Sequence, residues 1–201
     1  RAAAARAWPG DFVMDGEVID DRFHGFDLLS LAGADLCGQS CGDRYSALKD
    51  LIDSVAPSAH IGYVASWTDS LDKAEQLNAL RVNNAEGAVF KSMAAPYTAG
   101  RPNSGGPQLK LKFVATVSAL VTKVNQQRSV GVSLRGSDGD WEFVGNVTIP
   151  ANQGVPVVGA VVEVRYLYAT EGGTLYQPVY LGGRSDVEPG ECVASQLKFK
   201  A

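Results

Sequence analysis

The chain has 201 residues, of which 45% are apolar and 20% are charged, a composition typical of globular proteins. Its formal net charge of −4 at pH 7 argues against a protein that wraps nucleic acid by bulk charge alone. No stretch approaches the roughly 18 consecutive apolar residues of a membrane span, so a membrane protein is excluded.

The first part of the chain mixes strand and helix patterns. Alternating apolar residues predict strands, and apolar residues spaced at i, i+3 and i+4 predict amphipathic helices. In chain order, the predicted elements are a strand hairpin over 11–31, a helix over 44–55, a strand over 61–67, a helix over 70–82, and strands over 86–91 and 109–113. A long Gly/Pro/Ser loop separates the last two strands.

From Val114 onward the pattern changes to regularly spaced strands, separated by turns that contain Asp-Gly and Gly-Gly. The five predicted strands cover 114–124, 130–136, 141–149, 160–169 and 174–183. Five such strands are typical of a small β-barrel of the OB type. Neither part is basic, with 11 basic against 14 acidic residues up to Phe113 and 7 against 8 after it. Any contact with nucleic acid must therefore come from local patches.

The three cysteines, Cys37, Cys41 and Cys192, leave an odd one over, and residues 1–8 lack the features of a signal peptide and resemble the end of a helix. A reducing cytosol is therefore the expected compartment. Cys37 and Cys41 have a spacing that half of a zinc site could use. The two histidines lack a paired spacing, so loop thiols are favoured over a metal site.

Three short strings carry charged residues at predicted strand ends: DGE at 15–17, EGAVFK at 86–91 and KLK at 110–112. Lys110 and Lys112 point to one face, because side chains alternate along a strand. Glu86 and Lys91 face opposite ways unless Gly87 allows a bend. Lysines for phosphate oxygens and carboxylates for a divalent cation are what nucleotidyl transfer requires, since charge on phosphorus must be neutralised as it moves.

Five strings in this order resemble the covalent nucleotidyltransferase superfamily, most closely the ATP-dependent DNA ligases. They are MDGEVI at 14–19, FHGFDLL at 23–29, AEGAVFK at 85–91, QLKLKF at 108–113 and GGRSDV at 182–187, which resemble motifs III, IIIa, IV, V and VI. Each string alone occurs by chance in many proteins. The resemblance implies an α+β nucleotidyltransferase (adenylation) domain over 1–113, truncated at its N-terminus, followed by an all-β OB-fold barrel over 114–201.

The resemblance also implies roles in binding the nucleotide and its metal ion. Glu17 would contact the ribose and help to organise Mg²⁺, which Glu86 would also bind through a carboxylate oxygen. Phe26 would stack on the adenine ring, and Lys91 would lie in the same nucleotide site. The alternatives are a solvated carboxylate at Glu17, an isolated surface glutamate at Glu86, and a plain core residue at Phe26.

The remaining implied roles concern the phosphates of ATP. Lys110 and Lys112 would hold the α-phosphate and neutralise its developing charge. Arg184 and Asp186 would orient the pyrophosphate leaving group. The alternatives are an edge strand decorated with lysines and an exposed pair in a turn.

The chain departs from the family pattern in three places. It contains no K-x-D-G, the motif whose lysine becomes the covalent lysyl-adenylate, so we expect the sequence to start downstream of that motif. Tyr176 stands where many relatives carry an arginine, and Val187 stands where a lysine is common. These departures affect the first, ATP-consuming step more than nick sealing.

Taken with the resemblance, the sequence predicts a DNA ligase of repair or replication that seals 3′-hydroxyl/5′-phosphate nicks through enzyme-AMP and DNA-adenylate intermediates. It would use ATP and Mg²⁺, act as a monomer on nicked double-stranded DNA, and work in a bacterial or viral cytoplasm or at the nucleoid. An RNA ligase or a capping-type nucleotidyltransferase remains an alternative, as does an inactive nucleic-acid-binding module with an OB domain. A buried cluster of glutamates and lysines favours an enzyme over such a module.

Overall fold

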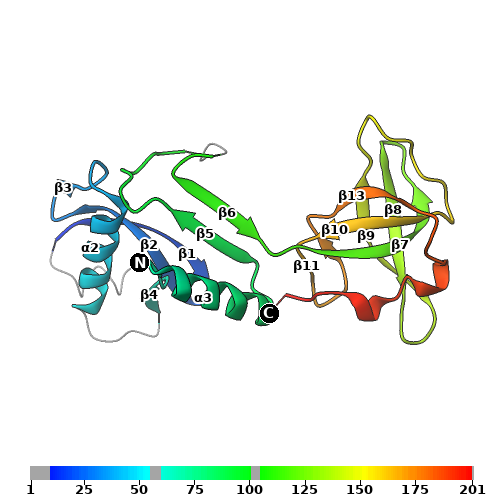
Figure 1. Cartoon of the computed structure of the whole chain (residues 1–201), viewed down its shortest axis with the longest axis horizontal. Helices are drawn as coiled ribbons and strands as arrows, with labels where there is room; N and C mark the ends of the chain where they lie inside the picture. Colours follow the sequence, from blue (N-terminus) through cyan, green and yellow to red (C-terminus); the bar gives the residue numbers. More distant parts are fainter. Residues whose placement is uncertain (1–9, 55–59, 101–104, 201) are drawn as a thin grey trace. The chain divides into compact units, whose positions relative to one another are not determined.

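The computed structural model describes residues 10–54, 60–100 and 105–200, and the expected helix end at 1–8 lies outside them (Figure 1). The chain forms two compact units. The N-terminal unit comprises Arg1–Lys73 and Val89–Lys110, and the C-terminal unit comprises Ala74–Ala88 and Leu111–Ala201. Within the described ranges, no helix has both the length and the apolar character needed to cross a membrane.

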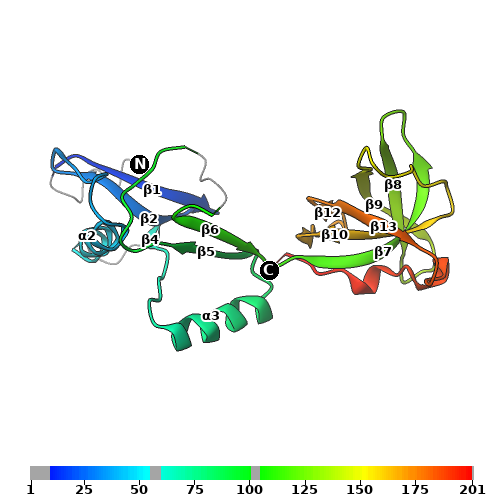
Figure 2. The same ribbon diagram turned by 45° about the horizontal axis from the view of Figure 1, so that its top comes forward.

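The N-terminal unit is built on a small sheet in which β1 (Phe12–Ile19) and β2 (Arg22–Leu31) form the predicted antiparallel hairpin. The short β3 (Ala34–Asp35) pairs antiparallel with β2, and β4 (Ile61–Tyr63) pairs parallel with it (Figure 2). β2 is therefore the central strand, and β1 lies at an edge. The strand predicted over 61–67 is real but ends at Tyr63.

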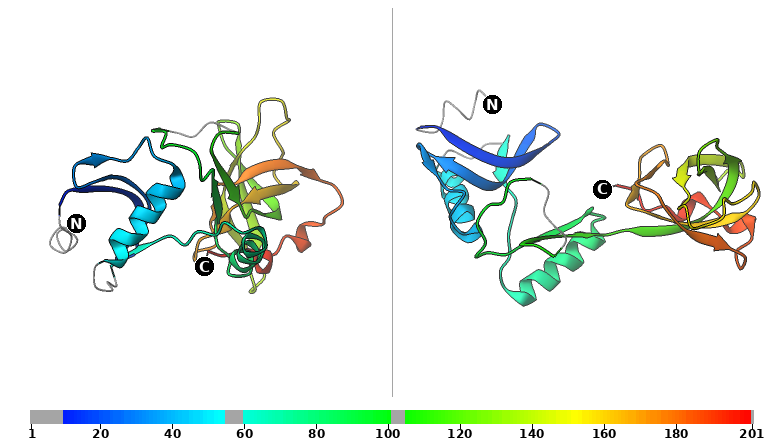
Figure 3. Two further views of the ribbon diagram at one scale, coloured as in Figure 1. Left: turned by 60° about the vertical axis from the view of Figure 1, so that its left-hand side comes forward. Right: turned by 90° about the horizontal axis from the view of Figure 1, so that it is seen from above.

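Both predicted helices are present. Helix α2 (Cys41–Asp53) begins three residues earlier than expected, because the Ser40 side chain accepts a hydrogen bond from the Asp43 N–H and caps the first turn. Its buried face packs on β2 (Figure 3) and forms a core with Leu28 at its centre. Helix α3 (Ser70–Val82) has the predicted bounds, and the Asp69 carboxylate accepts from backbone N–H groups of its first turn.

Strands β5 (Gly87–Lys91) and β6 (Gln108–Lys112) pair with each other as a separate two-stranded sheet. The division between the two units runs through this pair. Gly87 is required by close packing rather than by a bend, because a Cβ there would collide with the carbonyl oxygen of Leu111.

The C-terminal unit holds a five-stranded antiparallel sheet in the order β13-β10-β7-β8-β9. Its strands are β7 (Ala115–Val124), β8 (Ser129–Arg135), β9 (Trp141–Thr148), β10 (Val161–Tyr166) and β13 (Val179–Arg184). A small hairpin of β11 (Tyr168–Ala169) and β12 (Leu175–Tyr176) and two short 3₁₀ helices (Pro189–Glu191 and Ala194–Gln196) complete the unit. Valines from four of the five strands dominate the core.

The predicted number of long strands is confirmed, but the backbone pairing does not close these strands into the expected OB-type barrel. Among residues 105–200, no backbone pairing joins β9 to β13, so the sheet is open. The last two predicted strands are each divided, into β10 with β11 and β12 with β13. Turn spacing predicts how many strands there are, whereas closure depends on sheet curvature and on bulges such as that between Glu163 and Val164.

Candidate functional site

Lys91, at the end of β5, lies against Phe26 on β2. Its ammonium nitrogen is 4.9 Å from the centre of the Phe26 ring and donates a hydrogen bond of 3.3 Å to the Phe26 carbonyl oxygen. An ammonium over an aromatic face is attracted by the ring's quadrupole. Phe26 itself is half-buried rather than part of the core around Leu28. Two of the residues predicted for the nucleotide site are thus in contact.

Behind this contact is a buried ion pair that the sequence did not predict. Asp27 and Arg44 are 4% and 2% exposed, and the Arg44 guanidinium binds both carboxylate oxygens of Asp27, at 2.8 and 2.9 Å. The Lys91 ammonium lies 3.8 Å from the same carboxylate. The bond to Asp27 raises the pKa of Arg44 further above its usual value, although burial opposes this. The sequence contains one indication of this ion pair. Asp27 interrupts an apolar run, and an arginine lies in the following helix.

Arg44 also holds the surrounding loops in place. Its Nη1 donates to the carbonyl oxygens of Gln39, at 2.6 Å, and of Ala95, at 3.5 Å, and its guanidinium lies 5.8 Å from the centre of the Tyr97 ring. These contacts connect α2 to the loop that follows β5. The position of Lys91 on Phe26 is therefore supported by a well-bonded, buried charge pair.

The expectation of a buried Glu/Lys cluster is wrong, since Glu17, Glu86, Lys110 and Lys112 are all exposed. Glu17 lies near the end of the edge strand β1, opposite His24 on β2. Glu86 precedes β5, and its carbonyl oxygen accepts a hydrogen bond from the Phe113 N–H at 2.9 Å. Edge strands and strand ends expose side chains that a central strand would cover, so these charges remain hydrated.

The two lysines of β6 belong to different units. Lys110 is the last residue of the N-terminal unit before the division, and its side chain has no hydrogen bond or ion pair among the described residues. Lys112 belongs to the C-terminal unit, where its ammonium donates to the side-chain oxygen of Gln177 at 2.8 Å. Only Lys112 thus has a partner within its own unit.

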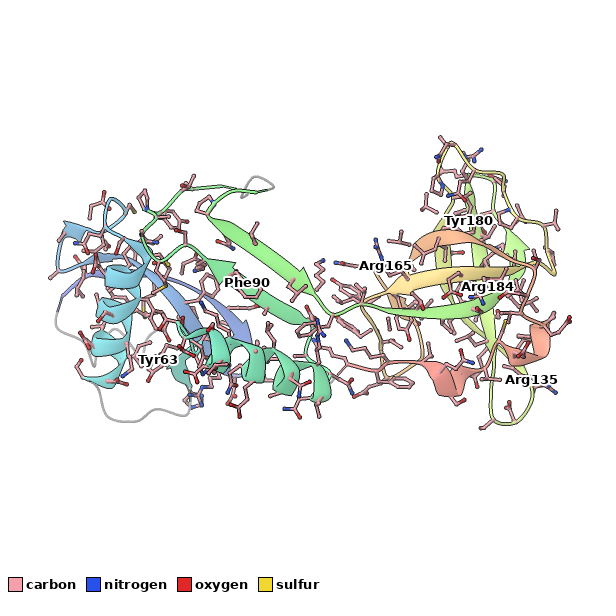
Figure 4. All side chains as sticks on the ribbon, viewed as in Figure 1. Tyr63, Phe90, Arg135, Arg165, Tyr180 and Arg184 are labelled. Carbon is pink, nitrogen blue, oxygen red and sulfur yellow. The ribbon has the colours of Figure 1, made fainter. Side chains whose placement is uncertain are left out.

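Arg184 and Asp186 pair with each other at the end of β13. Two guanidinium nitrogens of Arg184 lie 2.8 Å from the two oxygens of Asp186, and a third lies 2.8 Å from Glu163 on β10. The Arg184 side chain lowers the pKa of Asp186 to about 2. Burial opposes ionisation of Glu163, but bonds from Ser118, Thr116 and Arg184 outweigh it and lower the pKa of this carboxyl. Figure 4 shows Arg184 on this sheet.

The described part of the chain contains no group of three or more His, Cys, Asp or Glu side chains that could hold a metal ion. All three cysteines are free. Cys41 begins α2 and is buried, so the expectation of a loop thiol is wrong for this residue. Cys192 follows the first 3₁₀ helix and is buried in the core of the C-terminal unit. Cys37 is partly buried after β3.

No family model matches the chain, but curated proteins similar to it in sequence are named probable DNA ligases. A probable DNA ligase of Mycobacterium sp. (strain KMS) is 38% identical over 99 residues, which are 49% of this chain and 18% of the relative. A probable DNA ligase of Nocardioides sp. (strain ATCC BAA-499 / JS614) is 35% identical over 148 residues, covering 60% of this chain and 27% of the relative. The matched part thus spans about a quarter or less of these curated relatives.

Solved structures agree at the level of fold. A Lig E DNA ligase, described as binding DNA with a minimal scaffold, has a TM-score of 0.63 at 22% identity and covers 81% of this chain and 63% of its own. The structure named Pmar-Lig_PreS3 has a TM-score of 0.69 at 17% identity, covering 88% and 52%. The chain thus has a fold found in DNA ligases. In sequence, part of it is similar to curated proteins named probable DNA ligase.

Proposed function

We propose that this chain is part of an ATP-dependent DNA ligase that seals 3′-hydroxyl/5′-phosphate nicks through enzyme-AMP and DNA-adenylate intermediates. The contact between Lys91 and Phe26 carries the proposal, because it joins residues of two separate motif strings. The similarity to probable DNA ligases supports it. Nothing in the site favours an RNA ligase or a capping enzyme over this proposal.

In the proposed site, Phe26 offers a half-buried aromatic face to the adenine, and Lys91 is the nearby cation. Lys110 and Lys112 are the cations for the α-phosphate, and both are exposed, as a phosphate contact requires. A lysine ammonium is a mobile point charge, suited to an oxygen whose charge changes during transfer. Arg184 and Asp186 are proposed to orient the pyrophosphate.

The carboxylates are suited to Mg²⁺ but not to a metal site made by protein alone. Mg²⁺ usually keeps several waters and is held by one or two carboxylates together with substrate phosphates. Glu17 and Glu86 are exposed carboxylates of this kind. When bound, Mg²⁺ would neutralise phosphate charge, while the lysines position the phosphate oxygens.

The C-terminal unit is proposed to be an OB-type domain that binds nicked double-stranded DNA. Its five strands and its open sheet support a partly open, five-stranded OB architecture. The proposed boundary of the two domains remains Phe113/Val114, close to the division after Lys110. We further propose that the protein acts as a monomer in a bacterial or viral cytoplasm or at the nucleoid.

The experiment uses a nick that already carries AMP on its 5′-phosphate. In this last step the 3′-hydroxyl attacks the phosphate, a phosphodiester bond forms and AMP leaves, so no lysine nucleophile is needed. We expect the 201-residue chain to seal this nick with Mg²⁺, but not to label itself with AMP from ATP, because it contains no K-x-D-G.

Two results would reject parts of this proposal. If the folded chain binds the adenylated nick but releases no AMP and seals nothing, the chain is a binding module. A stable phosphoramidate on the chain after incubation with ATP would show that another lysine acts as the nucleophile.

A further inference from the structure

A cleft of about 360 Å³ lies in the C-terminal unit beside the start of β7. Three polar side chains line it, from Lys112, Arg165 and Gln177, and apolar residues including Tyr166 and Val179 form the rest of its wall. The volume is at the lower end of the roughly 300–1,000 Å³ of small ligand sites. All of its lining residues belong to one unit.

The polar lining offers N–H donors and no carboxylate. Lys112 donates to the Gln177 side-chain oxygen at 2.8 Å, which leaves the amide NH₂ of Gln177 and two ammonium protons of Lys112 as donors. Gln177 has a φ of +52°, a left-handed conformation that few residues other than glycine adopt. Such conformations cluster at ligand sites, and this one fixes where the Gln177 side chain leaves the backbone.

The Arg165 side chain has no hydrogen bond or ion pair within the part of the chain that the structure describes, and Figure 4 shows it projecting from β10. Its cross-strand neighbours, Thr116 and Val179, are uncharged. Glu163, two residues earlier on the same strand, is already bound by Arg184 at 2.8 Å and by Ser118 at 2.7 Å. The Arg165 guanidinium is therefore an uncompensated charge.

We propose that this cleft binds one phosphate group of the DNA backbone. The inference rests on the proposed function, which makes DNA the partner. The arginine fork can bind two phosphate oxygens at once, with the Gln177 amide as a further donor, and Lys112 is left for the α-phosphate proposed above. Arg165 is assigned to DNA rather than to ATP, because the phosphates of ATP already have proposed partners in Lys110, Lys112 and Arg184.

The test measures binding of the 201-residue chain to a nicked duplex over a range of salt concentrations. Loss of one phosphate contact lowers the slope of log K against log salt by about 0.9. We expect Arg165→Gln to show this loss with any DNA sequence, and Arg165→Lys to keep most of the slope. Lys123→Gln is the matched control, since Lys123 is an exposed cation on β7, seven residues or about 23 Å along the strand from Thr116.

Thermal unfolding is measured first, to show that each variant folds, and the salt slopes of the folded variants then decide the inference. An unchanged slope for Arg165→Gln overturns it, and so does an equal loss in Lys123→Gln, which would indicate diffuse attraction. Weaker ATP binding with an unchanged DNA slope also overturns it, in favour of a nucleotide phosphate. If the unaltered chain binds no nicked duplex at all, the proposed DNA partner itself fails and this inference fails with it.

Discussion

At the scale of single residues, the main feature is a charge pair taken out of water. Asp27 and Arg44 are almost completely buried, and desolvating two charges costs free energy that their mutual attraction recovers only with good geometry. The geometry here is good, because both carboxylate oxygens are bound and the guanidinium has further carbonyl partners. Such a pair favours one arrangement of β2, α2 and the loop after β5.

Arg44→Met should destabilise the N-terminal unit strongly. It would leave the Asp27 carboxylate buried with Lys91 as its nearest cation, and removing one partner of a buried pair typically costs about 3–5 kcal/mol. Urea unfolding, followed by a signal from the N-terminal unit, would measure this loss. The double variant Asp27→Leu/Arg44→Met should recover most of it, since no unpaired charge remains. A double variant as unstable as Arg44→Met alone would contradict this explanation.

Glu86→Ala and Lys110→Ala should lower the sealing activity and leave the stability almost unchanged. Both side chains are exposed, so each substitution should change the free energy of unfolding by less than about 0.5 kcal/mol. If they contact the metal ion and the phosphate, each should lower sealing of an adenylated nick by about 10²–10³-fold. Rates of single-turnover sealing test this, with Lys123→Ala as an exposed control. Sealing at the control's rate by both variants would reject their assignment to the site.

At the scale of elements, Arg184 links β10 to β13 by bonding Glu163 on one strand while it also bonds Asp186. Both carboxyls have a lowered pKa in the folded chain, to about 2 for Asp186. A lowered pKa means that the unfolded chain takes up protons first as the pH falls. Their contribution to stability is therefore complete above about pH 5 and is lost as the pH falls towards 2.

We expect the stability of the C-terminal unit to fall between about pH 5 and about pH 2, and Arg184→Met to flatten this dependence. Denaturant unfolding at a series of pH values would measure it. Arg135→Met is a suitable control, because the Arg135 side chain donates to the Gly139 carbonyl oxygen, which does not titrate. Equal pH dependence in the unaltered chain and in Arg184→Met would show that these pairs contribute little.

Local sequence patterns were sufficient for most elements. The β1–β2 hairpin and α3 follow from alternation and helical spacing over residues that are close in sequence. The pair of Asp27 and Arg44 could not be derived in that way, since it depends on how α2 packs against β2. The contact of Lys91 with Phe26 joins residues 65 apart, and only the family resemblance put both residues in one site.

At the scale of the whole molecule, the division between the units falls between the two lysines of β6. The residues after it are bound to the C-terminal unit: Lys112 donates to Gln177, the Phe113 carbonyl oxygen accepts from Lys198 at 2.7 Å, and Arg81 lies over the Phe113 ring. If the C-terminal unit turns during the reaction, Lys112 should move with it, while Lys110 stays with Phe26 and Lys91. Closure would then bring one of the two proposed phosphate cations into place.

This predicts a change in the distance between the units when a nicked duplex binds. Spin labels at Asp50→Cys on α2 and Asn152→Cys in the C-terminal unit, with Cys37→Ser to remove the most accessible thiol, would report it by pulsed electron resonance. We expect the distance distribution to shift and narrow with an adenylated nick. A label pair at Asn152 and Glu171, both exposed in the C-terminal unit, should not change. A distance distribution between the labels on the two units that is the same with and without the nick would contradict a turning C-terminal unit. Lys112 would then stay fixed relative to Lys110.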